Sequence, residues 1–344
     1  MKKIDLRSDT VTLPTTEMLD AIVSAELGDD VFQEDLTVNK LEKLAAKITN
    51  KDSALFVPSG TMANLVAIIT HCNRGDEVIL GDQAHTFLYE AGNISSFGGV
   101  HSRQIQNQED GTLLLDDIKD SIRKNDIHFP ITKLICLENT HNRCSGMPLT
   151  ISYMDEVIEI AKNSSISVHV DGARIFNAAI SLNVAVKDLV KDVDSVSFCL
   201  SKGLSAPAGS LICGSNKFID DARRNRKALG GGMRQSGVLA AAGIVALDTF
   251  ENRITNDHHN ARIIAEGISA LNGININLDR IKTNIIYFQL NHPDIDNIQF
   301  LDKMKESGIY FFEISSNNYR LVTNSGISSE DAEAVVSEFQ NVLA

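Results

Sequence analysis

The chain has 344 residues, of which 43% are hydrophobic and 22% charged, and it carries a formal net charge of −13 at pH 7. This composition is typical of a soluble globular protein with one large domain or two. The negative charge argues against nucleic acid and anionic membranes as partners, since both attract basic surfaces. The five cysteines form no Cys-x-x-Cys pair, which favours a reducing compartment and no structural zinc. No apolar leader is visible, and no window approaches the ~18 apolar residues of a membrane span. We therefore expect the cytoplasm.

Strand-like and helix-like runs alternate along the first two thirds of the sequence. Short, continuously apolar runs predict strands at 54–57, 77–80, 133–137, 166–170, 195–200 and 209–213. Helices are predicted between them at 61–72, 87–97 and 152–162. Strands that are apolar throughout are typical of a sheet covered on both faces, and their alternation with helices indicates βαβ units. The sequence thus predicts an α/β fold with a mostly parallel sheet.

The pattern changes after a glycine run at 230–232. Two long helices are predicted at 236–251 and 258–271. Strands at 285–290, 310–313 and 320–322 then mix with helices at 297–306 and 328–343. We therefore expect a large domain over residues 16–250 and a small C-terminal α+β domain over residues 251–344.

Two predicted strands are each followed by a residue that could take part in catalysis. Lys202 follows the strand at 195–200, and Asp171 follows the strand at 166–170. Open α/β sheets bind ligands at the carboxyl ends of their strands. Burial there favours a neutral lysine, which can attack a carbonyl. A Schiff-base lysine with an acidic partner for a pyridinium nitrogen is typical of pyridoxal phosphate (PLP) enzymes. Either segment alone would more often be a solvated turn, so the prediction depends on the pair.

Ser59, Gly60 and Thr61 follow the first predicted strand and open the next helix. A helix N-terminus offers unpaired N–H groups and partial positive charge, which suit a phosphate. The same residues also form an ordinary N-cap, and this alternative stays open. The chain has neither a Walker A loop nor a Gly-x-Gly-x-x-Gly run, which weakens the case for a nucleotide.

Two histidines stand at positions that suit chemistry. His85 follows a strand end and could stack on a planar cofactor, and His128 precedes a strand and could act as a mobile acid or base. The alternatives are a surface or core histidine and a turn histidine before a proline. Histidines outside any motif are expected at the surface: His71, His101, His258 and His259.

Eight motifs follow one another along nearly the whole chain: DLRSDTVT (5–12), GDDVFQED (28–35), PSGTM (58–62), ENTHN (138–142), HVDGAR (169–174), CLSKGL (199–204), LGGGMRQ (229–235) and RLVT (320–323). In this order they resemble the low-specificity L-threonine aldolases. These are PLP enzymes related to the β-eliminating lyases, with the aspartate aminotransferase-like fold known as fold type I. The resemblance implies a mostly parallel seven-stranded sheet and a homodimer or homotetramer.

The resemblance also implies roles around the cofactor. Lys202 is implied to hold PLP through a Schiff base, Asp171 to pair with the pyridinium nitrogen, and Arg174 to hydrogen-bond the phenolic oxygen. His85 is implied to stack on the ring and to assist proton transfer. The implied phosphate ligands are Ser59, Gly60 and Thr61, with Lys227 and Arg234 reaching a phosphate across a dimer interface. No metal is implied.

For the substrate, the resemblance implies a carboxylate clamp made by Ser8 and Arg320, with the segment 1–15 folding back onto the site. Tyr89 and His128 are implied to approach the β-hydroxyl group. The base that takes the hydroxyl proton stays open between His85 and His128. Many relatives carry tyrosine where this chain has Phe32, so a role for a hydroxyl group at that position is in doubt.

The implied reaction is the cleavage of L-threonine, L-allo-threonine and related β-hydroxy-α-amino acids to glycine and an aldehyde. A PLP-dependent β-eliminating lyase, which would release pyruvate and ammonia, is the first alternative. The second alternative is a PLP-binding protein without catalysis. A metal-dependent aldolase lacks a clustered set of His, Asp and Glu ligands in the sequence.

Overall fold

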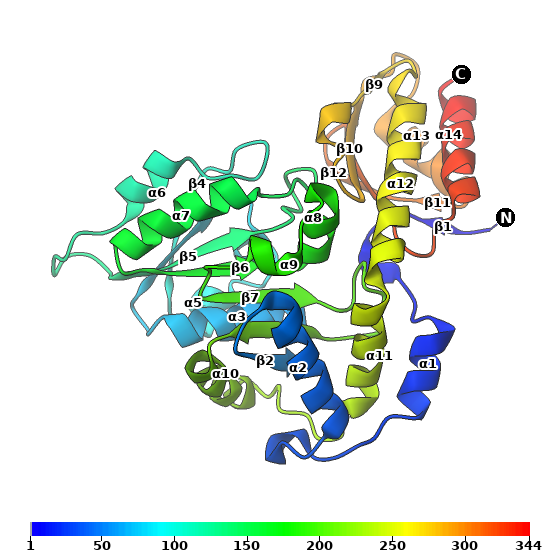
Figure 1. The fold of residues 1–344 in the computed structure, drawn as a ribbon. Helices are drawn as coiled ribbons and strands as arrows, with labels where there is room; N and C mark the ends of the chain where they lie inside the picture. Colours follow the sequence, from blue (N-terminus) through cyan, green and yellow to red (C-terminus); the bar gives the residue numbers. More distant parts are fainter. Residues whose placement is uncertain (1) are drawn as a thin grey trace.

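The computed structural model describes residues 2–344, and a seven-stranded sheet forms its centre (Figure 1). From edge to edge the strands are β2 (Ser53–Val57), β8 (Ser210–Gly214), β7 (Ser195–Cys199), β6 (Ser167–Asp171), β5 (Thr132–Glu138), β3 (Glu77–Gly81) and β4 (His101–Ile105). Strand β8 is antiparallel to both neighbours, and the other adjacent pairs are parallel. The predicted α/β fold with a mostly parallel seven-stranded sheet is confirmed. The carboxyl ends of the parallel strands meet at one edge.

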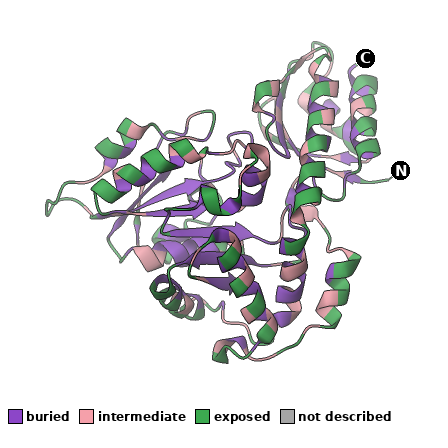
Figure 2. Cartoon of the chain, viewed as in Figure 1, coloured by how far each residue is buried: buried purple, intermediate pink, exposed green. Residues whose placement is uncertain are grey.

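Successive residues of each strand enter different cores, because side chains alternate between the two faces of a strand. In β2, Phe56 packs into the core of one face and Leu55 into that of the other. One face is covered by α2 (Leu36–Thr49), α7 (Ile151–Asn163) and α8 (Ile175–Leu182), and the other by α3 (Gly60–His71) and α10 (Asn216–Ala228). Figure 2 shows strands that are buried throughout and helices whose outer sides are exposed.

A second, smaller sheet lies in the C-terminal part of the chain. Helices α11 (Gly237–Asp248) and α12 (Phe250–Ser269) lead to it. Its strands, in spatial order, are β12 (Phe312–Ser315), β13 (Asn318–Val322), β10 (Ile285–Leu290) and β9 (Ile274–Asn275). It packs with α12, α13 (Asn297–Glu306) and α14 (Ser329–Leu343) around a core of contacting aromatic rings: Phe288, Phe300, Phe311, Tyr319 and Phe339. That residues 16–250 and 251–344 are independent domains stays a prediction.

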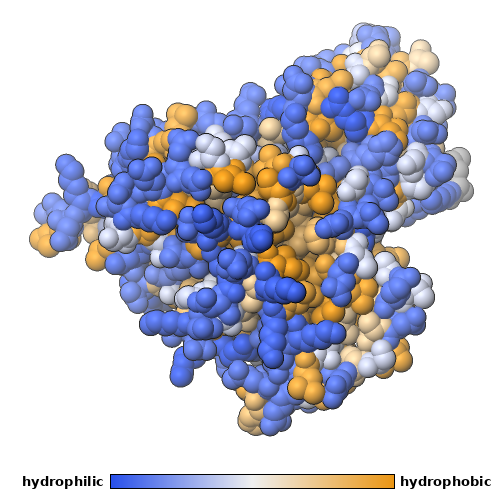
Figure 3. All heavy atoms as spheres, viewed as in Figure 1, coloured by the Kyte–Doolittle hydropathy of each residue, from blue (hydrophilic) through white to orange (hydrophobic). Residues whose placement is uncertain are grey.

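The N-terminal segment connects these two parts. Its strand β1 (Ile4–Asp5) pairs in parallel with β11 (Ile309–Tyr310), in the C-terminal part. The chain then runs to α1 (Thr16–Val23), which packs against α11 (Figure 1). Figure 3 shows a mostly hydrophilic surface on this side, with apolar atoms gathered in the middle of the view.

The predicted helix at 87–97 is wrong. The structure has two short helices there, α4 (His85–Leu88) and α5 (Asn93–Ser96). Between them Ala91 and Gly92 have φ values of 56° and 64°, in the left-handed region that interrupts a right-handed helix. Among the described helices, none has the length and apolar character needed to cross a membrane.

Candidate active site

A cavity of about 390 Å³ lies between the carboxyl edge of the large sheet and the C-terminal part. It collects side chains from six separate regions of the sequence: 8–10, 85–89, 142–143, 174, 202 and 312–320. Of the predicted site residues, those that line it are Ser8, His85, Tyr89, Arg174, Lys202 and Arg320. The structure therefore brings six of the thirteen predicted site residues to one cavity.

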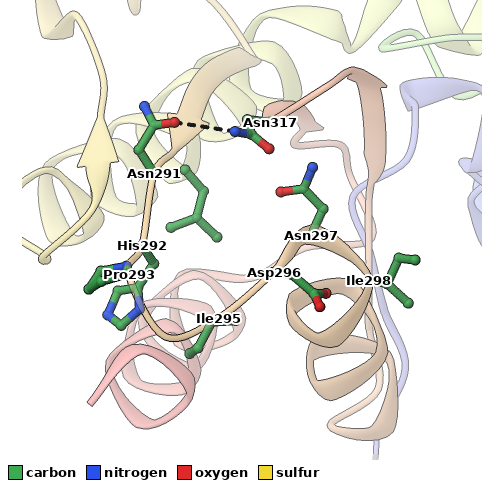
Figure 4. A pocket seen from close by; sticks show the side chains of 9 residues that line it. Asn291, His292, Pro293, Ile295, Asp296, Asn297, Ile298 and Asn317 are labelled. Atoms are coloured by element: carbon green, nitrogen blue, oxygen red, sulfur yellow. Dashed lines mark hydrogen bonds between the residues drawn. The ribbon is translucent and has the colours of Figure 1, made fainter.

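A larger cavity, of about 730 Å³, lies beside the loop that joins β10 to α13 (Figure 4). None of the predicted site residues lines it. Its polar groups serve the local fold. Asp296 caps α13 through the N–H of Gln299, and the ring of His292 accepts a hydrogen bond from the N–H of Asp294. Asn317 donates across the cavity to Asn291. These partners account for the polar lining without a ligand.

Lys202 and Asp171 extend from neighbouring strands. Lys202 is half-buried just beyond β7, and Asp171 is the last residue of β6, with 2% exposure. The Asp171 carboxylate accepts hydrogen bonds from Asn64 Nδ2 at 2.9 Å and from the N–H of Ala173 at 3.1 Å. A buried carboxylate held by two neutral donors in this way can pair with a cationic ring nitrogen.

His85 is held from two sides. Its backbone N–H donates to Glu138 Oε2 at 2.7 Å, and its Nδ1 lies 2.9 Å from Glu90 Oε1. Burial lowers the pKa of His85, but the hydrogen bond to Glu90 and the charge of Asp171 outweigh it, so this pKa is raised above its ordinary value. Burial raises the pKa of Glu90. With Nδ1 bound to Glu90, Nε2 is the ring nitrogen that remains for a ligand.

Arg174 is held by an acidic residue from the N-terminal segment. Its Nε and Nη2 each donate to the Asp9 carboxylate at 2.7 Å, and both side chains are buried. Burial lowers the pKa of Arg174, but the charge of Asp9 outweighs it and raises this pKa. The remaining nitrogen, Nη1, faces Asn142 Oδ1 at 3.5 Å. Asp9 therefore takes two of the five N–H donors of Arg174 and leaves the second N–H of Nη2 and the two of Nη1 for other contacts.

Arg320 comes from β13 and reaches the cavity from the C-terminal part. Its Nη1 donates to Asn142 Oδ1 and its Nη2 to the carbonyl of Arg7, each at 3.0 Å. Its Nε has no hydrogen-bond partner among the described residues, although the atom is buried. Ser8 and Tyr89 line the same cavity, and the Tyr89 hydroxyl accepts a hydrogen bond from Arg143. The guanidinium is thus fixed in place with donor capacity left over, as a carboxylate ligand would need.

The N-terminus of α3 lies beside the end of β7. Ser59 caps this helix by accepting the N–H of Met62, and Ser59 and Thr61 are exposed. A Cβ atom at Gly60 would stand 2.7 Å from Cys199 Sγ, so a larger residue there would require the Cys199 side chain to move. The first turn of α3 therefore presents open N–H groups close to the segment that carries Lys202.

These groups match the three functions of PLP. The primary amine of Lys202 suits its aldehyde, the buried carboxylate of Asp171 suits its ring nitrogen, and the first turn of α3 suits its phosphate. The residues present therefore fit this cofactor.

Comparisons with known proteins agree with this geometry. The model of the β-eliminating lyase family matches residues 5–291. A low-specificity L-threonine aldolase of Arabidopsis thaliana is 46% identical, with 100% of this chain and 97% of the relative covered. The low specificity L-threonine aldolase of Escherichia coli K12 is 42% identical over 99% of both chains. The chain belongs to the β-eliminating lyase family, among the low-specificity L-threonine aldolases. The threonine aldolase of Leishmania major shares the fold, with a TM-score of 0.85 at 19% identity, covering 99% of this chain and 100% of that one.

Not every predicted site residue reaches the cavity of this family member. His128 is exposed on the loop before β5, and its ring contacts Asp126 at 2.7 Å. That loop lies at the amino end of β5, whereas the cavity lies at the carboxyl ends of the strands. Within one chain, the expected approach of His128 to the substrate is therefore not formed.

Lys227 and Arg234 also stay outside the cavity. Lys227 is exposed in the last turn of α10, and Arg234 pairs with Asp29 at 2.9 Å. Between them, Gly231 lies against Met62, in the first turn of α3. The segment after α10 thus borders the helix end proposed for the phosphate, but in this chain neither cation is directed into the cavity.

Some residues that shape this aldolase-family cavity received no role from the sequence. Asp9 and Asn142 lie inside the quoted motifs. The motifs therefore indicated that these two residues matter, but did not indicate what they contact. Glu90 and Asn64 lie outside the motifs, and their contacts with His85 and Asp171 join separate elements of the fold. Nothing in their local sequence distinguishes them from ordinary core residues.

Proposed function

We propose that this chain uses PLP, held by Lys202, to cleave L-threonine, L-allo-threonine and related β-hydroxy-α-amino acids to glycine and an aldehyde. The observation that supports it most strongly is the convergence of Lys202, His85 and Arg320 on one cavity beside the buried carboxylate of Asp171. Such an activity would consume threonine and supply glycine. The names of the relatives support the same reaction.

Arg320 is proposed to bind the carboxylate of the substrate. Asn142 and the Arg7 carbonyl already hold its two terminal nitrogens, so little side-chain entropy remains to be lost on binding. The Ser8 hydroxyl lines the same cavity and can donate a further hydrogen bond. This clamp would fix which substituent of Cα lies toward His85.

His85 is proposed to take the proton of the β-hydroxyl group at Nε2. Glu90 accepts the Nδ1 proton, which leaves the Nε2 lone pair facing the cavity, and the raised pKa of His85 strengthens it as a base. When bound, PLP supplies the electron sink for cleavage of the Cα–Cβ bond, and Asp171 holds the charge that develops at its ring nitrogen.

We propose that the phosphate lies at the N-terminus of α3, against Ser59, Gly60 and Thr61. Lys227 and Arg234 would reach a phosphate only in another copy of the chain, and the same holds for His128 and a substrate. This arrangement favours a homodimer or homotetramer. The cytoplasmic location expected from the sequence stays a prediction.

Product analysis tests the proposal. The purified, PLP-loaded protein is given L-threonine, and acetaldehyde and glycine are measured together with Lys202→Ala as the control. We expect equimolar acetaldehyde and glycine from the wild type and almost none from the variant, since its side chain has no amine. Release of 2-oxobutanoate and ammonia instead, the products of β-elimination from threonine, would favour a β-eliminating lyase. Full activity of Lys202→Ala would refute the role of Lys202.

A further inference from the structure

A stripe of polar side chains lies beneath α3, on the same face of the large sheet as the apolar residues Leu55, Val57 and Ile212. His169 and Asp171 alternate along β6, and Ser195 and Ser197 along β7. The register sets His169 beside Ser195 and Asp171 beside Ser197, and none of the four exceeds 2% exposure. Burial of polar groups costs free energy unless they are partnered. Packing alone therefore does not explain the stripe.

Helix α3 completes this stripe with Asn64 and His71. The two residues are seven positions apart, which places them on the same side of the helix. Asn64 lies near the carboxyl edge of the sheet, beside Asp171. His71 lies at the other end of α3, where it lines a pocket of about 510 Å³ at the amino edge, together with Lys51 and Asp194. Its ring stacks on Phe218 of α10, with the centroids 4.5 Å apart.

Hydrogen bonds connect these side chains from one edge of the sheet to the other. His71 Nε2 lies 2.7 Å from Ser195 Oγ, which lies 2.8 Å from His169 Nδ1. His169 Nε2 lies 3.4 Å from Asn64 Oδ1, and Asn64 Nδ2 lies 2.9 Å from Asp171 Oδ2. The chain of contacts thus joins a pocket at the far edge to the carboxylate of the candidate active site.

The chain has one direction. Burial lowers the pKa of His71 to about 4 and that of His169 to about 3, so both rings are neutral at pH 7 and each has one N–H. Carboxylates accept, so Asn64 turns its Nδ2 to Asp171 and its Oδ1 to His169. His169 then carries its proton on Nε2 and accepts from Ser195, which in turn accepts from His71. Every donor hydrogen points toward Asp171.

Two further contacts support this assignment. Asn64 Nδ2 also donates to Glu90 Oε1 at 2.8 Å, and Ser197 Oγ donates to Asn64 Oδ1 at 2.9 Å. An acceptor on one side and a second donor on the other leave the amide of Asn64 a single favourable orientation.

We propose that His71, Ser195 and His169 are positioning residues that act through Asn64 on Asp171 and strengthen the binding of PLP from the opposite edge of the sheet. Aligned hydrogen bonds in a buried environment polarise one another, which makes Asn64 a stronger donor to Asp171. The amide does not readily pass on a proton, so the chain orients and stabilises the carboxylate. This inference rests on the proposed function, because it assigns Asp171 to the ring nitrogen of PLP.

The test measures the dissociation constant of PLP for the apoprotein by absorbance titration. Ser195→Ala removes the middle of the chain, and His71→Leu removes its first donor. His71→Gln is the matched control, because glutamine has nearly the size of leucine and keeps an N–H donor. Loss of one neutral hydrogen bond predicts binding about 3- to 10-fold weaker for Ser195→Ala and His71→Leu, and near the wild-type value for His71→Gln.

A second readout needs neither PLP nor turnover. Nitrogen-15 NMR of the apoprotein reports which ring nitrogen of His169 carries the proton. We expect Nε2–H in the wild type and a mixture of the two forms in Ser195→Ala, where Nδ1 has lost its donor. Thermal unfolding of each variant separates these effects from a loss of the fold.

Wild-type PLP affinity in both Ser195→Ala and His71→Leu would overturn the proposal while leaving the proposed function intact. Equal weakening by His71→Leu and His71→Gln would also overturn it, because packing on Phe218 would then be the cause. A wild-type chain that binds no PLP would refute the proposed function itself.

Discussion

The two faces of β6 and β7 share one backbone but carry different kinds of side chain. On one face, Val168, Val170, Val196 and Phe198 are all buried in the main apolar core. On the other face, under α3, the same strands carry buried polar side chains that are joined by hydrogen bonds. Only the second face ends at the candidate active site.

The difference shows how one sheet separates stability from chemistry. Apolar burial is favourable without direction, whereas a buried polar group must be partnered, and its partners fix its orientation. We therefore expect changes on the apolar face to act on the free energy of unfolding. Changes on the polar face should act on the cofactor and on turnover.

The largest expected effect is that of Asp171→Asn, on the polar face. The fold should remain, because asparagine has the same size and its Oδ1 can keep one of the two hydrogen bonds that Asp171 accepts. The loss of a buried charge opposite a cationic ring nitrogen predicts a fall in kcat of about 100-fold or more, measured as glycine formation. Activity within a few-fold of the wild type would contradict the division between the two faces.

Phe198→Ala tests the apolar face of the same pair of strands. Phe198 is 1% exposed, and its ring packs edge-on against Phe176 at 5.2 Å. Its removal predicts a loss of about 3 to 5 kcal/mol in the free energy of unfolding, measured by urea denaturation. The folded fraction should bind PLP as the wild type does. Weakened PLP binding with unchanged stability would reverse the assignment of the faces.

A smaller effect is expected at Asp257, a buried acid that contrasts with the partnered stripe. Its Oδ2 has no hydrogen-bond partner among the described residues, and burial followed by the charge of Asp9 raises its pKa from 3.8 to about 8. The folded state therefore holds this proton more tightly than the unfolded state. Stability is lost as the pH rises from about 4 to about 8.

Asp257→Asn removes that loss. We expect the variant to unfold at about 2 °C or more above the wild type at pH 8, with a smaller difference at pH 5. Melting curves at the two pH values check this. A difference that is the same at both would show that the carboxyl group is not protonated in the fold.

Much of the large sheet could be predicted from the sequence, because its strands are apolar throughout. The helices on its outer faces were harder, and neither α2 nor α10 was predicted. In α10 charged residues outnumber the few apolar positions. This omission affected His71, which we expected at the surface. The structure shows it half-buried against Phe218, a residue of the helix that the sequence did not reveal.

In the candidate site, the residues that could be predicted from the sequence are those at the ends of strands. Lys202 and Asp171 stand where two apolar runs stop, so position alone made them candidates. The partners that orient them come from elsewhere in the chain, as Asn64 and Glu90 do, and only the fold brings them together. The sequence around His128, in a turn, does not indicate which edge of the sheet it faces, and in one chain it lies at the amino end of β5. Its approach to a substrate in another copy of the chain stays a prediction.

The pairing of β1 with β11 has a consequence for synthesis. Ile4 leaves the ribosome long before its partner Ile309 exists. The segment that carries Ser8 and Asp9 therefore has no partner strand while the large sheet forms. Until that segment is in place, Arg174 lacks the buried ion pair that it forms with Asp9. A nascent chain can thus complete the scaffold of the sheet while the candidate active site stays open, and the site closes last.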